Sequence, residues 1–127
     1  MFPRETSKSK TGRIGEDLTC KYLAGKRYEI LARNYRKPWG EIDIVAKAPD
    51  KTLVFVEVKT MHDVGEAGLT PEDQMSSSKL IKLKRTCEKF VAKNEGLLNE
   101  NRGWRIDLVA ITLGERKPEV RHYENVV

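Results

Sequence analysis

Cysteine, histidine and long apolar runs are scarce in this sequence of 127 residues, and each scarcity excludes a class of protein. Cys20 and Cys87 have no CxxC spacing, which excludes a cysteine zinc site and a disulfide scaffold, so we expect two reduced core thiols. His62 and His122 lack metal-ligand spacing and are expected at the surface. No apolar run approaches the ~18 residues of a membrane span, and the N-terminus lacks the apolar centre of a secretory signal. We therefore expect a cytoplasmic protein.

Charged residues are abundant, in contrast to these rarer types. They make up 34% of the chain, against 39% hydrophobic residues, and the length fits one domain with one core. We expect a single domain over residues 11–127, preceded by a flexible, basic arm at residues 1–10. Twenty-four Lys and Arg against nineteen Asp and Glu give a net charge of +5, which favours polyanionic partners. Many ordinary domains are equally basic, so the motifs must decide.

Hydrophobic periodicity predicts the order of helices and strands along the chain. The predicted elements are a helix over residues 11–24, strands over 28–35, 41–47 and 52–60, a long loop over 61–78, a helix from Ser76 or Ser78 to Asn94, a strand over 104–113, and a short last strand after a turn at 114–118. This order of one helix, three strands, one helix and two strands predicts an α/β or α+β fold around a mixed sheet.

Two acidic residues and a lysine fall on neighbouring predicted strands. Residues two apart in a strand share a face, so Glu57 and Lys59 point the same way, while Ile42 and Ile44 share the face opposite Asp43. If the two strands pair through the turn between them, counting outward sets Asp43 near Glu57, give or take one register step. Two carboxylates and a lysine would then meet on one face.

Such a group has a chemical use in holding a hard divalent cation. Mg²⁺ is commonly held by one or two carboxylates together with water and phosphate oxygens, and it lowers the pKa of bound water. Lys59 could orient an attacking water or stabilise charge developing on a phosphate. The alternative is an ordinary salt-bridged strand surface. Asp43 on a second strand and Glu16 beside the apolar stripe of the first helix favour a site.

Several short blocks, taken together and in order, resemble a known family. The blocks at 40–46 and 55–60, GEIDIVA and FVEVKT, resemble the core motif of the PD-(D/E)XK nuclease superfamily. Together with 12–17, 33–36 and 106–110, they resemble the bacterial YraN-like family, which is similar to archaeal Holliday junction resolvases. The resemblance runs from Gly12 to about Leu113 and implies a restriction-endonuclease-like fold, with a mixed central β-sheet flanked by helices.

Roles for individual residues follow from this resemblance. It implies that Asp43 and Glu57 hold Mg²⁺ or Mn²⁺, that Lys59 serves the attacking water, and that Glu16 adds a further acid from the first helix. Junction resolvases act as symmetric dimers, so a homodimer is also implied. The family usually has an Arg shortly after the Lys, where this chain has Met61. Either phosphate contact comes from elsewhere or the activity is reduced.

The second predicted helix carries a basic face suited to backbone phosphates, formed by Lys79, Lys82, Arg85 and Lys89. A solvated helix surface is the alternative. Trp39 and Trp104 could stack on bases, although their positions at strand boundaries are more typical of core or rim residues. Asp107 alternates with apolar neighbours and is interpreted as structural or as a polar group at a sheet edge.

Three functions are therefore compatible with the sequence. The first is a metal-dependent endonuclease that cleaves DNA, including branched or structured DNA, by metal-activated water. The second is a catalytically weak or inactive nucleic-acid-binding module that keeps the nuclease fold. The third is a protein-interaction domain with a charged surface. The acidic pair with its lysine favours the first.

Overall fold

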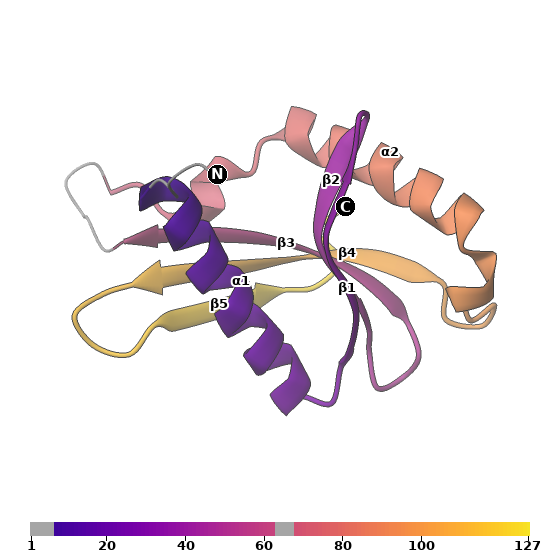
Figure 1. The fold of residues 1–127 in the computed structure, drawn as a ribbon, viewed down its shortest axis with the longest axis horizontal. Helices are drawn as coiled ribbons and strands as arrows, with labels where there is room; N and C mark the ends of the chain where they lie inside the picture. Colours follow the sequence, from indigo (N-terminus) through magenta and orange to yellow (C-terminus); the bar gives the residue numbers. More distant parts are fainter. Residues whose placement is uncertain (1–6, 63–67) are drawn as a thin grey trace, which may run out of the picture.

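A five-stranded sheet with one long helix on each face forms the protein in the computed structural model, which describes residues 7–62 and 68–127 (Figure 1). The elements are α1 (Ser7–Gly25), β1 (Glu29–Lys37), β2 (Gly40–Lys47), β3 (Leu53–His62), η1 (Pro71–Gln74), α2 (Ser77–Lys93), η2 (Glu95–Leu97), β4 (Trp104–Leu113) and β5 (Glu119–Tyr123). Neither α1 nor α2 is long and apolar enough to cross a membrane.

The sheet is mixed, with the strands in sequence order from β1 to β5. Only β3 and β4 are parallel, because α2 lies between them in the chain and returns it to the same end of the sheet. The other neighbours are antiparallel. The predicted α/β fold, a mixed central sheet flanked by helices, is confirmed and is consistent with a restriction-endonuclease-like domain.

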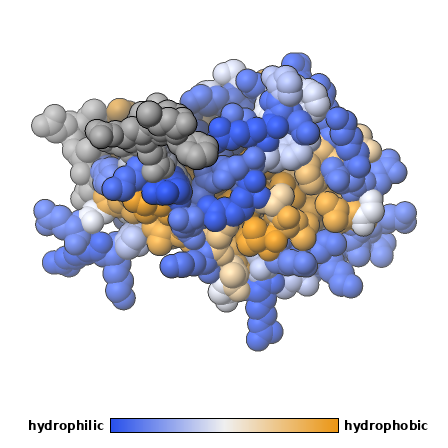
Figure 2. All heavy atoms as spheres, in the orientation of Figure 1, coloured by the Kyte–Doolittle hydropathy of each residue, from blue (hydrophilic) through white to orange (hydrophobic). Residues whose placement is uncertain are grey.

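Two apolar clusters hold the helices against the sheet. On one face, Leu23 of α1 packs with Val54, Val56 and Val109. On the other, the buried side of α2 packs with Phe55 and Ile106, and it includes Leu83, Cys87 and Phe90. Alternate residues of β3 thus pack in opposite clusters, because successive side chains of a strand point to opposite faces of the sheet. Figure 2 shows mostly hydrophilic side chains over the viewed surface, with apolar atoms visible only in patches.

Most predicted elements lie within a few residues of their observed bounds. The strand over residues 104–113 is confirmed at both ends, and Ser76 is the N-cap of α2, accepting a hydrogen bond from the Lys79 backbone N–H. The first helix begins at Ser7 rather than residue 11, so residues 7–10 are helical and not part of an arm. Residues 1–6 of the predicted arm lie outside the described residues. The predicted loop over 61–78 is wrong at its edges, where β3 ends and α2 begins, and it contains η1.

One prediction about the β2 faces is wrong. Ile42 and Ile44 were expected on the same apolar face, but Ile44 packs in the α1-side cluster and Ile42 in the α2-side cluster. The reason lies in the pairing of β2, which follows β3 only from Lys47 to Ile44 and continues with β1 alone to Gly40. The strand pair β1 and β2 turns away from the rest of the sheet at that point (Figure 1).

Candidate functional site

Asp43 lies where β2 departs from β3. The last paired residues of this ladder are Ile44 and Val56, so the next backbone N–H of β3 on that side needs another acceptor. Asp43 Oδ2 supplies it and accepts a hydrogen bond from the Val58 backbone N–H at 2.8 Å. The departure of the strand therefore brings the Asp43 carboxylate onto β3, next to Glu57.

Glu57 and Lys59 share the α2-side face of β3, as predicted, and form an ion pair. Lys59 Nζ lies 3.4 Å from Glu57 Oε1, and the two side chains are only 19% and 17% exposed. Burial raises the pKa of Glu57 to about 7, and the negative charge of Asp43 adds to the rise. Burial also raises the pKa of Asp43, against the opposing effects of the Val58 N–H and Lys59. Two buried carboxylates side by side favour sharing a proton when no cation is bound.

Glu16 reaches the same region from α1 because the helix lies very close to β3. Gly15 lies against Thr60, and a Cβ at residue 15 would overlap the Thr60 side chain. The Oε1 atom of Glu16 is buried and accepts no hydrogen bond from residues 7–62 or 68–127. Burial and then the charge of Asp43 raise the pKa of Glu16, and the cations of Arg33 and Arg36 offset part of this rise. A buried carboxylate oxygen without a donor is suited to a cation or a water.

A cleft of about 360 Å³ opens beside this acidic group. Glu57 and Lys59 line it from β3, and Lys79 and Lys82 line it from α2. The β1–β2 hairpin supplies another part of the wall, which includes Lys37 at the end of β1, a cation that sequence reasoning missed. We refer to this space as the acidic–basic cleft. It brings two of the four predicted phosphate-binding residues close to the predicted metal ligands.

Arg85 and Lys89, the other two predicted phosphate-binding residues, line a separate hollow of about 640 Å³ on the adjoining side of α2. Trp39 and Ile81 lie in the same hollow, and Lys82 borders both spaces. Trp104 instead packs edge-on against Phe55 in the core. The two tryptophans therefore differ, and Trp39 alone lines a described surface hollow.

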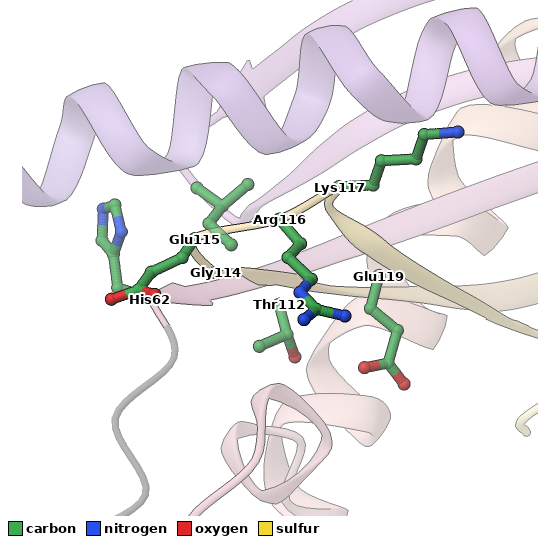
Figure 3. A pocket seen from close by; sticks show the side chains of 8 residues that line it. His62, Thr112, Gly114, Glu115, Arg116, Lys117 and Glu119 are labelled. Atoms are coloured by element: carbon green, nitrogen blue, oxygen red, sulfur yellow. The ribbon is translucent and has the colours of Figure 1, made fainter.

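Another hollow, of about 610 Å³, lies near the end of β3 and the β4–β5 turn (Figure 3). Its side chains include His62, Arg116, Lys117 and Glu119, so both charges are mixed. Among these residues, no two carboxylates lie together on neighbouring strands. His62 is exposed, as predicted, and its Nε2 lies 3.1 Å from Thr11 Oγ1. The hollow lacks the arrangement of acids that the cleft contains.

Asp107 matches one of its two predicted alternatives, a structural residue rather than a polar group at a sheet edge, whereas His122 is placed differently from prediction. Asp107 is fully buried in β4, an interior strand, rather than at a sheet edge, and the His122 side chain is 6% exposed rather than at the surface. Burial opposes ionisation of Asp107, but hydrogen bonds with His122 and Arg105 outweigh it and lower the pKa of Asp107. The two residues come together because β5 pairs with β4, a long-range contact that periodicity does not show.

Asp107, His122 and Glu124 place one ligand atom each within 4.8 Å of one another, as a metal site would. Arg105 already occupies this group. Its Nε lies 3.0 Å from Asp107 Oδ1, and its guanidinium also bonds Asp107 Oδ2 and Glu124. His122 Nε2 lies 2.8 Å from Asp107 Oδ2. We interpret the group as a structural ion-pair network, because the guanidinium supplies the positive charge that a metal would bring.

Comparison with known proteins places the chain in a family. The model of the Uncharacterised protein family UPF0102 matches residues 15–111. A UPF0102 protein of Alkaliphilus oremlandii is 39% identical and aligns over 91% of this chain and 96% of its own length. Another, of Roseiflexus castenholzii, is 40% identical over 89% of this chain and 87% of its own. The predicted YraN-like relationship is thereby confirmed at the level of the family: this chain belongs to the protein family UPF0102.

Proposed function

We propose that this protein is a metal-dependent endonuclease that hydrolyses phosphodiester bonds of DNA. We also propose that it is a member of the PD-(D/E)XK superfamily, related to the archaeal Holliday junction resolvases. One observation carries the proposal above all others. The buried carboxylate of Asp43 lies beside that of Glu57, and Glu57 and Lys59 line a cleft that Lys79 and Lys82 also line.

The donor set fits a hard divalent cation. Asp43 and Glu57 offer oxygen ligands, and the unsatisfied Oε1 of Glu16 offers a third from the side of α1. Burial and then the charge of Asp43 raise the pKa of Glu57 to about 7, and a bound cation would stabilise the ionised form of both acids. When bound, Mg²⁺ or Mn²⁺ supplies a water of lowered pKa and neutralises charge on the scissile phosphate.

The chain's own residues would do the remaining work. Lys59 lies on the same strand face as Glu57, where its ammonium can orient the attacking water or stabilise the charge developing on phosphate. Lys79 and Lys82 of α2 hold the DNA backbone across the cleft without reading its sequence. Lys37, at the end of β1, is the fourth lysine of that cleft, beside Lys59, Lys79 and Lys82. It offers a phosphate contact in place of the Arg that the family usually has where this chain has Met61.

A nucleic-acid-binding module without catalysis is the second candidate. The observation that favours it is the Lys59–Glu57 ion pair at 3.4 Å, because a lysine tied to a metal ligand competes with the cation. Met61 favours it as well. In that case the same cleft and basic helix bind the backbone, and no strand is cut.

DNA as the partner, a homodimer and a cytoplasmic location complete the proposal. The first is supported by the lysines of the cleft and by the net charge of +5. The homodimer rests on the resemblance to resolvases, and the cytoplasmic location rests on the sequence. Branched DNA is included because two equivalent scissile strands match a symmetric dimer.

Incubation of the protein with labelled duplex, single-stranded, flap and four-way-junction DNA tests this function. Each substrate is compared in Mg²⁺, in Mn²⁺ and in EDTA, with Lys59→Ala as a variant. Divalent-dependent cleavage that is lost in Lys59→Ala supports the endonuclease. Salt-dependent binding without cleavage in any divalent ion supports the binding module, and no binding at low salt contradicts both.

A further inference from the structure

The hollow beside the acidic–basic cleft has a composition unlike that of the cleft itself. Its floor is apolar and is formed by the half-buried Trp39 and by Ile81 of α2, which is 56% exposed. Three cations, Lys82, Arg85 and Lys89, surround this floor, with Glu88 as the single acid. We refer to it as the Trp39 groove. A polyanion with flat apolar parts fits such a surface better than a purely apolar or purely ionic ligand does.

Trp39 lies at the border between the groove and the cleft. Its chain neighbours Pro38 and Gly40 line the cleft, and Gly40 packs so closely on Thr86 of α2 that a Cβ would overlap the threonine side chain. This contact fixes the β1–β2 turn against α2. Lys89 and Lys93 each place their Nζ 4.7 Å from the centre of the Trp39 ring. An aromatic ring is thus held beside the cleft with two ammonium groups over it, which a stacking base would displace towards its own phosphates.

We propose that the Trp39 groove binds an unpaired nucleobase of the DNA strand whose backbone lies in the acidic–basic cleft. This inference rests on the proposed function, whose substrate it narrows. The indole ring provides a stacking surface that accepts any base, and Ile81 extends the apolar contact. Lys82 borders both spaces and would hold the phosphate between the base in the groove and the bond to be cut. Arg85 and Lys89 would hold the next phosphates.

The substrate class follows from this placement. A base can reach the groove only when it is out of the duplex stack, and unstacking a paired base costs a few kcal/mol. The preferred DNA therefore has a single-stranded stretch next to the scissile phosphate, as in a flap, a gap or a frayed branch. An uninterrupted duplex would use the lysines of the cleft and leave the groove empty.

Intrinsic fluorescence tests the groove without any cleavage, because the chain has only two tryptophans, Trp39 and Trp104. The full chain in EDTA at low salt is titrated with an oligo-dT strand and with a blunt duplex of equal length. We expect oligo-dT to quench the emission and the duplex to bind without quenching. Trp104→Phe should keep the quenching, and Trp39→Phe should lose it. Quenching carried by Trp104, or equal quenching by both DNAs, overturns the proposal.

Affinity measurements separate stacking from mere proximity. In an anisotropy assay with labelled oligo-dT, Trp39→Ala should weaken binding roughly five- to 100-fold, the range for loss of one stacked base, and Ile81→Ala should weaken it less. Duplex affinity should stay within about twofold in both variants. Ile81→Ala keeps the proposal testable if Trp39→Ala does not fold, because Ile81 is an exposed side chain whose loss should leave the fold intact. Equal weakening for both DNAs, or none for oligo-dT, contradicts the inference.

The two proposals fail in distinguishable ways. If the Trp39 groove does not bind bases, Trp39→Ala leaves oligo-dT affinity unchanged while the wild type still cleaves DNA with Mg²⁺. If the endonuclease proposal fails, no DNA is cut by any form of the protein, yet base-dependent quenching through Trp39 persists. An acidic peptide that quenches Trp39 as strongly as oligo-dT does would show that the groove binds protein instead, and would overturn the inference.

Discussion

Asp43 Oδ2 accepts a hydrogen bond from the backbone N–H of Val58 at 2.8 Å. This bond joins β2 to β3 beyond the last residue pair of their ladder. One carboxylate oxygen is used for this structural bond. The other oxygen is not required for it and can serve a cation. The residue that closes the gap between two strands is therefore also the proposed metal ligand.

Substitutions at Asp43 should separate these two roles. Asp43→Asn keeps a carbonyl oxygen for the Val58 N–H but loses the charge, whereas Asp43→Ala leaves that donor unpaired. We expect Asp43→Ala to lower the free energy of unfolding by about 1–3 kcal/mol, and Asp43→Asn to change it less. Both should lose Mn²⁺ binding in calorimetric titration. Unchanged Mn²⁺ affinity in a folded Asp43→Asn protein would remove Asp43 from the metal site.

The close approach of Gly15 to Thr60 predicts a cost for any side chain at residue 15. Gly15→Ala should destabilise the protein by about 1–3 kcal/mol, because α1 must move away from β3. Gly12→Ala is the matched control, since a Cβ at residue 12 meets nothing within 4 Å and a helical Gly→Ala change usually stabilises by about 0.5–1 kcal/mol. Chemical unfolding measures both. Equal effects of the two substitutions would contradict the close packing.

The raised pKa of Glu57 makes stability depend on pH in a definite direction. Its folded pKa of about 7 lies above the ordinary value of 4.5, so its stabilising contribution is complete below pH 4.5 and is lost as pH rises through 7. The metal-free protein should lose on the order of 3 kcal/mol of unfolding free energy from this group between pH 4.5 and 8. Glu57→Gln should flatten this part of the profile, and Mg²⁺ should restore stability to the wild type at pH 8.

A matched substitution checks that the pH effect belongs to the site. Glu100→Gln removes an exposed carboxylate and should leave the pH profile of unfolding as in the wild type. If Glu57→Gln and the wild type have parallel profiles between pH 4.5 and 8, burial and the charge of Asp43 do not raise the pKa of Glu57 as described.

The network around Asp107 predicts a structural role distinct from metal binding. Asp107→Asn leaves the part-buried Arg105 guanidinium with only the more exposed carboxylate of Glu124, which should cost about 3 kcal/mol. His122→Gln should cost less and should bind Mn²⁺ with wild-type affinity. Calorimetry on folded His122→Gln checks this. Loss of Mn²⁺ binding there would move the metal site from the cleft to the group of Asp107, His122 and Glu124.

Local pattern was sufficient to predict the meeting of Asp43, Glu57 and Lys59. A strand period of two residues and one short turn place them on neighbouring strands, and both are local properties of the chain. The same reasoning misplaced Ile42, because the twist of β2 away from β3 depends on its pairing with β1. His122 was misplaced, and only the sheet-edge alternative for Asp107 was wrong, because the burial of both residues depends on the pairing of β5 with β4.

Helical periodicity placed Glu16 beside the apolar stripe of the first helix, and the resemblance to a family then assigned it a role in the site. Its place beside the pair depends on the approach of α1 to β3 at Gly15 and Thr60, which no helical period shows. A glycine directly before an acidic residue in the middle of a helix was the available signal for that approach. Lys37 carried no comparable signal, since its role depends on how the β1–β2 turn lies against α2.

Cleavage by Glu57→Gln, compared with the matched surface variant Glu100→Gln, tests the central claim most directly. Labelled flap DNA is incubated with Mg²⁺ and an excess of each folded protein, and the rate of strand scission is measured. We expect wild-type cleavage by Glu100→Gln and a loss of roughly 100-fold or more in Glu57→Gln, because the cation loses a ligand. Cleavage by Glu57→Gln at the wild-type rate would contradict a catalytic site at Asp43, Glu57 and Lys59.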